Sequence, residues 1–232
     1  MNGIIVAIDG PAASGKSTTA RRVAQRLGYS HLNSGLLYRT IAWLGLRDGW
    51  IDDANRFADE LEELRITMDR RPPGFVVRVN GEFPGAVLAA SQTAVRASHV
   101  AARADVRECA LGVLRAAGTD GGIACDGRDI GTIVFPGAAL KIFLVASAEE
   151  RARRRVEEQG IEPDRQRLEL EMSRLRERDD RDSARDLAPL RRAPDAIEID
   201  TTRLTPDDVV DEIVVLAIDR GARMVDDICD SV

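Results

Sequence analysis

Residues 3–18 read GIIVAIDGPAASGKST, an apolar run followed at once by a glycine-rich segment. Residues 3–9 are dominated by Ile, Val and Ala, which predicts a buried β-strand. The segment from Gly10 matches the pattern GxxxxGK[ST] and leads into KSTTARRVAQRLG, whose helical spacing ends at Gly28. A strand, a glycine-rich loop and a helix in this order predict a P-loop, which binds phosphate groups.

The loop also carries the residue types that phosphate chemistry requires. Small residues let successive backbone N–H groups converge on phosphate oxygens, and the dipole of the following helix adds a positive end. Lys16 is expected to reach the β- and γ-phosphates, and the Ser17 hydroxyl is expected to bind Mg²⁺. The predicted nucleotide-binding residues of the loop are Gly10, Pro11, Ala12, Ala13, Ser14, Gly15, Lys16, Ser17 and Thr18.

The composition is that of a globular protein. The 232 residues are 44% hydrophobic and 31% charged, and no apolar run approaches the roughly 20 residues that cross a bilayer. The formal net charge of -6 argues against nucleic-acid binding, which requires a basic surface. The first residues lack the features of a secretory signal, so we expect a cytoplasmic protein. We also expect a monomer that binds neither nucleic acid nor membranes.

Beyond the loop, predicted strands alternate with predicted helices. This alternation predicts an α/β fold with a central parallel sheet covered by helices on both faces. The further core strands are expected at YSHLN (29–33), GGIACDG (121–127), LKIFLVA (140–146) and AIEID (196–200).

Two segments depart from this alternation. Between Leu64 and Gly85, RITMD and FVVRV alternate in polarity and Asn80-Gly81 favours a type I′ hairpin, which predicts a small inserted antiparallel sheet. Further along, residues 161–182 predict a helix dense in Arg, Asp and Glu. We therefore expect two insertions in the parallel core.

A P-loop alone fits GTP switches, nucleic-acid motors and small-molecule kinases. The guanine-reading sequence NKxD is absent, and motors are usually longer. A small-molecule kinase needs a second cationic site for its acceptor and a cover that excludes water. SGLLYR (34–39) and DGRDIG (126–131) follow predicted strands, whose carboxyl ends meet at one sheet edge, and the arginine-rich helix can supply the cover.

Six segments together resemble the bacterial cytidylate kinases, within the nucleoside monophosphate (NMP) kinase group. They are GPAASGKST, SGLLYR, SHVAARADVRE, DGRDIGTIVFPGA, ERARRR and ERDDRDSAR, in the family's order. The resemblance implies transfer of the γ-phosphoryl group of ATP to CMP or dCMP with Mg²⁺. It also implies a core of residues 1–35, 118–157 and 188–232, an NMP-binding insertion at about 36–117 and a helical lid at about 158–187.

On the donor side, the resemblance implies catalytic roles for Lys16, Arg128 and Arg178, with Arg178 at the transferring phosphoryl group. Asp126 ends an apolar strand, as acids that hold Mg²⁺ through water commonly do, and joins Ser17 as the expected metal site. The remaining expected nucleotide-binding residues are Arg151 at adenine and Arg155 at phosphate, four residues apart on one helix face.

On the acceptor side, the resemblance implies a site for a cytosine nucleotide. The expected residues are Ser34, Arg39 and Arg128 at the α-phosphate, Ser98, Arg107 and Asp129 at the base, and Asp182 and Arg185 at the ribose and nearby phosphate, with Arg178 beside them. In a chain this rich in arginine, Arg178 and Arg185 also fit a solvated helix with weak ion pairs.

One position departs from the family, because Asn33 stands where an acid usually precedes SGLLYR. Mg²⁺ affinity or turnover is expected to change, while the fold and the substrate class stay. His31 and His99 are expected to be structural or surface residues. Two alternatives stay open: a kinase for another acceptor, such as UMP or shikimate, and a non-catalytic nucleotide-binding regulator.

Overall fold

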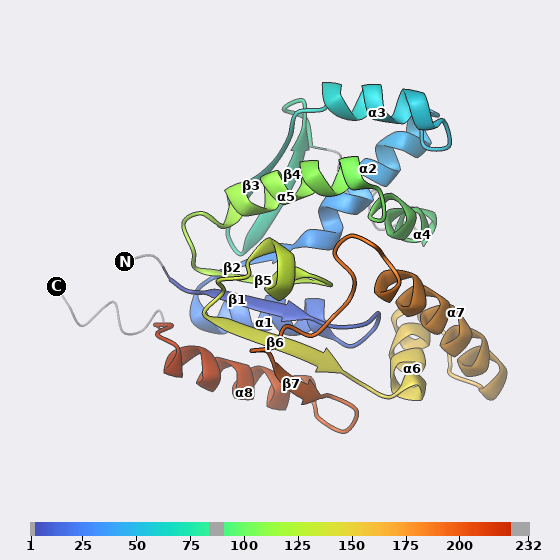
Figure 1. Cartoon of the computed structure of the whole chain (residues 1–232). Coiled ribbons are helices and arrows are strands. Elements are labelled where there is room, and N and C mark those ends of the chain that lie inside the picture. Colours follow the sequence, from blue (N-terminus) through green and yellow to red (C-terminus); the bar gives the residue numbers. More distant parts are fainter. Residues whose placement is uncertain (1–2, 84–90, 224–232) are drawn as a thin grey trace.

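A computed structural model describes residues 3–83 and 91–223, and its centre is one seven-stranded sheet with helices on both faces (Figure 1). The strands lie in the order β3-β4-β2-β5-β1-β6-β7, and only β3 runs antiparallel to its neighbour. The predicted α/β fold with a mostly parallel sheet is therefore confirmed. The strands are β1 (Ile5–Asp9), β2 (Ser30–Asn33), β3 (Ile66–Arg71), β4 (Gly74–Val79), β5 (Ile123–Gly127), β6 (Leu140–Val145) and β7 (Ile197–Asp200).

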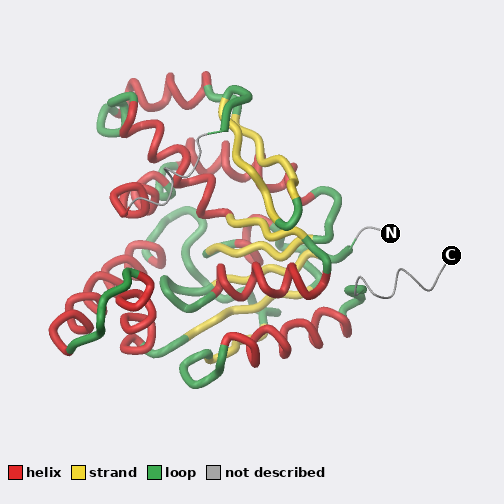
Figure 2. Tube along the Cα trace, turned by 180° about the vertical axis from the view of Figure 1, so that it is seen from behind, coloured by secondary structure: helices red, strands yellow, loops and turns green. Residues whose placement is uncertain are grey.

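The helices divide between the two faces of the sheet and its carboxyl edge. α1 and α8 pack together under one face, α2 and α5 cover the other, and α6 packs against α7 beyond the edge (Figures 1 and 2). The helices are α1 (Lys16–Leu27), α2 (Ser34–Arg47), α3 (Ala54–Glu63), α4 (Ser91–Val100), α5 (Ala104–Gly118), the π-helical turn η2 (Ile130–Val134), α6 (Ala148–Glu158), α7 (Arg165–Ser183) and α8 (Pro206–Asp219).

Strand β1 explains why the sheet is buried on both faces. Val6 and Ile8 are fully buried in the core beneath α1 and α8, while Ala7, between them, lies in the core beneath α2 and α5. Successive side chains of a strand point to opposite faces, so an unbroken apolar run fits a strand with both faces covered.

The inserted antiparallel pair forms, but two of its predicted details are wrong. The register pairs Arg71 with Gly74, so the turn that joins β3 to β4 lies at residues 72–73 and not at Asn80-Gly81. Asn80 and Gly81 have φ of 52° and 85° and turn the chain after β4, where Val79 and Glu82 exchange two backbone hydrogen bonds. The pair is also not a separate sheet, because β4 extends the central sheet beside β2. Gly85, the predicted end of this segment, lies outside the described residues.

The strand register brings three loops together at the carboxyl edge. Asp9 at the end of β1 lies beside Gly127 of β5, and Asn33 at the end of β2 lies beside Asp126. The P-loop, the start of α2 and the segment after β5 therefore meet, at the side of the molecule opposite the start of β1 and the end of α8 (Figures 1 and 2).

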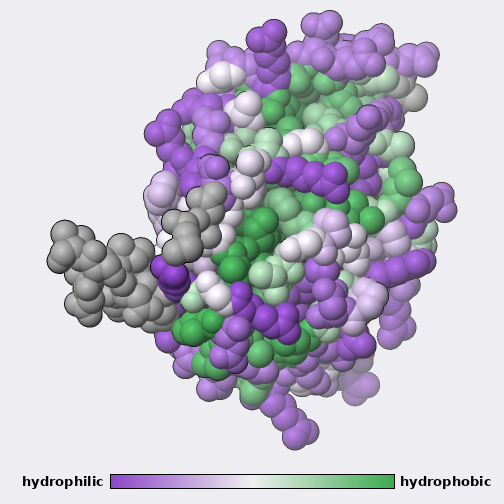
Figure 3. Space-filling model, turned by 60° about the vertical axis from the view of Figure 1, so that its left-hand side comes forward, coloured by the Kyte–Doolittle hydropathy of each residue, from purple (hydrophilic) through white to green (hydrophobic). Residues whose placement is uncertain are grey.

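Figure 3 shows one face of the molecular surface. Hydrophilic side chains dominate its periphery, and hydrophobic ones lie nearer the middle. In residues 3–83 and 91–223, no helix combines the length and apolar character needed to cross a membrane.

Candidate active site

The P-loop connects β1 to α1 and has a backbone that requires small residues at two positions. A Cβ atom at Gly10 would lie 2.3 Å from the carbonyl oxygen of Leu144. Gly15 has a φ of 87°, in the left-handed region, and caps α1 without a side-chain hydrogen bond. The N–H groups of the first turn of α1 are therefore left for an anion, as the sequence predicts for a phosphate site.

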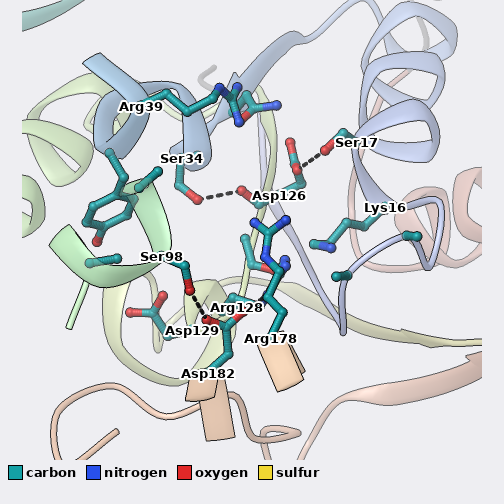
Figure 4. A pocket seen from close by; sticks show the side chains of 18 of the residues that line it. Lys16, Ser17, Ser34, Arg39, Ser98, Asp126, Arg128, Asp129, Arg178 and Asp182 are labelled. Carbon is teal, nitrogen blue, oxygen red and sulfur yellow. Dashed lines mark hydrogen bonds and ion pairs between the residues drawn. The ribbon is translucent and has the colours of Figure 1, made fainter. Parts of the chain in front are cut away.

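Lys16 is the first residue of α1 and lines the cleft at the carboxyl edge of the sheet. Its Nζ donates a hydrogen bond to the carbonyl oxygen of Pro11 over 2.7 Å. Arg128 and Arg178 reach toward the same space (Figure 4). Burial, and then the charge of Arg128, lower the pKa of Lys16 well below its ordinary value. Three cations around one space favour a strongly negative ligand such as a polyphosphate.

Asp126, at the end of β5, forms a buried polar cluster with Ser17 and His31. Its Oδ2 accepts a hydrogen bond from the Ser17 hydroxyl, and its Oδ1 lies 2.7 Å from His31 Nε2. Burial raises the pKa of Asp126, but the hydrogen bonds to His31 and Ser17 outweigh it and bring the pKa below the ordinary value. Ser34 Oγ donates to the backbone carbonyl of Asp126 over 2.7 Å and so joins the start of α2 to this strand (Figure 4).

A buried ion pair also lines this cleft. Arg107, on α5, pairs with Asp129 Oδ2, and the two side chains are only 9% and 5% exposed. Burial raises the pKa of Asp129 against the opposing charge of Arg107. A buried pair of this kind is costly to form, which is expected where its groups also bind a ligand.

A second ionic cluster links α7 to α4 and to the segment after β5. Asp182 accepts hydrogen bonds from Arg128 Nε over 2.8 Å, from Arg185, and from Ser98 Oγ over 3.2 Å. Burial raises the pKa of Asp182, but Arg128 and Arg185 bring it below the ordinary value. The cluster joins residues of α4, the segment after β5 and the last turns of α7 (Figure 4).

Two cleft arginines have no ion-pair partner among the described residues, Arg39 and Arg178. The Nε of Arg178 is buried without a hydrogen-bond acceptor. Burial and the neighbouring Arg128 lower the pKa of Arg178 to about 10, and burial also lowers the pKa of Arg39. Both side chains stay cationic at neutral pH, and each can bind an anion that enters the cleft.

Comparison with known proteins agrees with this geometry. The family model described as Cytidylate kinase matches residues 6–219. The chain belongs to the cytidylate kinase family. The cytidylate kinase of Geobacillus kaustophilus is 43% identical over 221 residues, which cover 94% of this chain and 97% of that protein. The cytidylate kinase of Geobacter sp. (strain M21) is 41% identical over 211 residues, covering 90% of this chain and 91% of its own.

The structure gathers most of the residues that the cytidylate kinase resemblance predicts. Four predicted residues do not line the cleft: Gly10, Pro11, Ser14 and Arg151. The guanidinium of Arg151 instead pairs with Asp179, so its predicted role toward adenine stays a prediction. The predicted residues that do line the cleft are Ala12, Ala13, Gly15, Lys16, Ser17, Thr18, Ser34, Arg39, Ser98, Arg107, Asp126, Arg128, Asp129, Arg155, Arg178, Asp182 and Arg185.

Two residues of the site, Tyr38 and Asp179, were not predicted from the sequence, and His31 was predicted to be only structural. Tyr38 lines the cleft beneath the guanidinium of Arg107, 5.5 Å from the ring centre, and its place four residues after Ser34 on one helix could have indicated it. His31, expected to be structural, contacts the predicted metal ligand Asp126. Asp179 contacts the P-loop from 167 residues away, and no local pattern indicates that contact.

Proposed function

We propose that this chain transfers the γ-phosphoryl group of ATP to CMP or dCMP. The observation that carries the proposal is one cleft with two subsites: a P-loop with Lys16 and Ser17, and the ion pair of Arg107 with Asp129. Arg178 lines the same cleft and has no ion-pair partner among the described residues. Membership of the cytidylate kinase family supports it. A GTP switch or a regulator has no use for this second buried ionic site.

The reaction proposed is a direct in-line transfer. An α-phosphate oxygen of the acceptor, held by Arg39 and Arg128, attacks the γ-phosphorus, and the bond to the β–γ bridging oxygen breaks as ADP leaves. Lys16 and Arg178 offset the negative charge on the transferring group, and positioning supplies most of the rate. The acceptor oxygen is already ionised at neutral pH, so the reaction needs no general base.

The residues around Ser17 and Asp126 fit a bound Mg²⁺ ion. Both offer oxygen ligands, and Mg²⁺ in nucleotide sites commonly takes one or two protein oxygens and completes its shell with phosphates and water. In residues 3–83 and 91–223, no group of three or more acid, His or Cys side chains could hold a metal by itself, which fits an ion that arrives with the nucleotide. With Mg²⁺ held by Ser17 and Asp126, the site would gain the positive charge that offsets the negative charge of the donor phosphates.

We further propose the domain division that the resemblance implies: a core of residues 1–35, 118–157 and 188–232, an NMP-binding insertion at about 36–117 and a lid at about 158–187. Ser98 of the proposed insertion and Asp182 of the proposed lid both line the cleft and meet there, as expected for two units that close over it. We also propose that the protein works as a cytoplasmic monomer.

A coupled assay for ADP release tests the proposal. With Mg-ATP as donor, CMP and dCMP are expected to be turned over far faster than UMP, AMP or shikimate, and Lys16→Ala serves as the inactive control. Comparable rates with UMP or shikimate would favour a different kinase, and no acceptor-dependent ADP release would favour a regulator.

A further inference from the structure

The last turns of α7 contact the P-loop through Asp179. Its Oδ1 accepts a hydrogen bond from the backbone N–H of Ala12 over 2.9 Å. Its Oδ2 pairs with Arg151 of α6, and Arg151 Nη1 also donates to the carbonyl oxygen of Ala12 over 3.0 Å. We call these three residues the Asp179 contact. It holds the N–H and the C=O of Ala12, two backbone groups of the P-loop, from outside the loop.

This contact is partly shielded from water and lies beside a constrained backbone. The side chains of Arg151 and Asp179 are 13% and 15% exposed, so their attraction is stronger than that of a surface pair. The next residue of the loop, Ala13, has a φ of 58°, in the left-handed region that a residue with a Cβ adopts at a cost. The two contacts fix Ala12, which stabilises the loop next to the unfavourable backbone of Ala13.

The contact also continues an apolar stripe on α7. Leu168, Met172 and Leu175 are spaced by four and three residues, and Leu175 packs against Ala12 of the P-loop and Ala152 of α6. Asp179 follows at the next position of the same stripe. One face of α7 therefore packs on α6, with Leu175 reaching Ala12, and a carboxylate near the end of the helix binds the P-loop.

The next residue of this stripe, Asp182, contacts residues that are proposed to bind the acceptor. Asp182 follows Asp179 by three residues and binds Arg128, Arg185 and Ser98. The end of α7 thus contacts the donor loop through one acid and the acceptor residues through the other. Arg178, adjacent to Asp179 in the chain, lines the cleft on the same turn of α7 (Figure 4).

We propose that Asp179 is a positioning residue for phosphoryl transfer: by fixing the P-loop at Ala12 and pairing with Arg151, it sets the end of α7 so that Arg178 faces the donor phosphates. The proposal is independent of the acceptor and rests on the proposed function only for its kinetic consequence. Because Arg151 neutralises the carboxylate, Asp179 sits near the loop without repelling the phosphates.

Removing the side chain has two expected effects. In Asp179→Ala, the Ala12 N–H loses its acceptor and Arg151 loses its partner, which is expected to raise the KM for ATP and lower kcat by about tenfold each. The KM for CMP is expected to stay within about twofold, because the contacts of Asp182 are untouched. Asp179→Asn keeps an oxygen that can accept from the Ala12 N–H but loses the charge that pairs with Arg151. Its KM for ATP and its kcat are therefore expected to lie between those of wild type and of Asp179→Ala.

The test combines steady-state kinetics with hydrogen exchange at the backbone amide of Ala12 in the nucleotide-free protein. The matched control is Asp180→Ala, which removes an exposed acid one position along the same helix. Faster Ala12 exchange and a raised KM for ATP in Asp179→Ala, with both unchanged in Asp180→Ala, support the proposal. Asp179→Asn carries the test if Asp179→Ala does not fold.

Two results would overturn the proposal. The first is amide exchange at Ala12 in the Asp179 variants equal to that of wild type. The second is an equal rise in KM for ATP and for CMP that follows the fall in melting temperature alone. If wild type failed to phosphorylate CMP, the proposed function would fail, while the exchange of Ala12 would still decide whether the Asp179 contact orders the P-loop.

Discussion

Asp129 is the residue on which selection of cytosine is expected to depend. Its Oδ2 is taken by Arg107, while Oδ1 has no donor among the described residues and the side chain lines the cleft. Cytosine presents an amino group at N4, which can donate to Oδ1, whereas uracil presents a carbonyl oxygen there. Asp129→Ala is therefore expected to remove a favourable contact for CMP and none for UMP.

The size of this effect follows from one hydrogen bond to a charged acceptor, worth about 1.5–3 kcal/mol. The ratio of kcat/KM for CMP over UMP is thus expected to fall by about 10- to 150-fold in Asp129→Ala. The same variant leaves Arg107 buried without its partner, at a cost to folding of about 3–5 kcal/mol. Urea unfolding must therefore accompany the kinetics, with Asp129→Asn as a milder variant.

The assay is the acceptor-dependent release of ADP, measured with CMP and with UMP at saturating Mg-ATP. The ratio of the two acceptors separates base reading from general damage, because misfolding lowers both rates together. An unchanged ratio with both rates lowered would show that Asp129 only holds Arg107. Wild-type turnover of UMP as fast as that of CMP would refute base selection by this site.

Three further predictions concern the donor side, the lid and the buried carboxyl of Asp9. Lys16→Ala is expected to lower phosphoryl transfer by orders of magnitude while the protein stays folded, and near-normal turnover with an unchanged melting curve would contradict its role. Amide exchange across residues 160–187 is expected to slow when ATP and CMP analogues are bound together, so equal exchange with and without them would count against a lid. Burial raises the pKa of Asp9 to about 6, so the folded protein binds its proton more tightly than the unfolded chain, and the contribution of Asp9 to stability falls as pH rises from about 4 to 6. Urea unfolding of Asp9→Asn between these pH values is expected to lack this decline, and a slope equal to that of wild type would contradict it.

The parts of the fold that depend on local pattern were predictable. A few consecutive residues are enough to indicate an apolar strand or the loop at Gly10, and all the predicted core strands are present in the structure. The turn at Asn80-Gly81 was misplaced because that dipeptide favours a tight turn wherever it stands, while the pairing of Arg71 with Gly74 fixes where the hairpin closes. Register between strands is a property of the assembled sheet, and a dipeptide signal does not contain it.

The residues of the candidate site also differ in how far the sequence predicts them. Lys16 and Ser17 follow from the loop pattern alone, since their chemistry is set by position in the motif. Asp182 and Ser98 are 84 residues apart, and their hydrogen bond could be expected only through the family resemblance. Nothing in the sequence indicates the contact of Asp179 with Ala12. Asp179 is one of many acids on an arginine-rich helix, and the neighbouring residues look the same whether such an acid is solvated or buried.

The central claim is phosphoryl transfer to a cytosine nucleotide, and the most direct measurement follows the phosphate itself. ATP labelled at the γ-phosphate is incubated with Mg²⁺, CMP and the protein, and the products are separated by chromatography. The account predicts that the label appears in CDP, in amounts equal to the ADP formed, with Lys16→Ala giving none. Label recovered as inorganic phosphate, or label left in ATP while the nucleotide is bound, would contradict it.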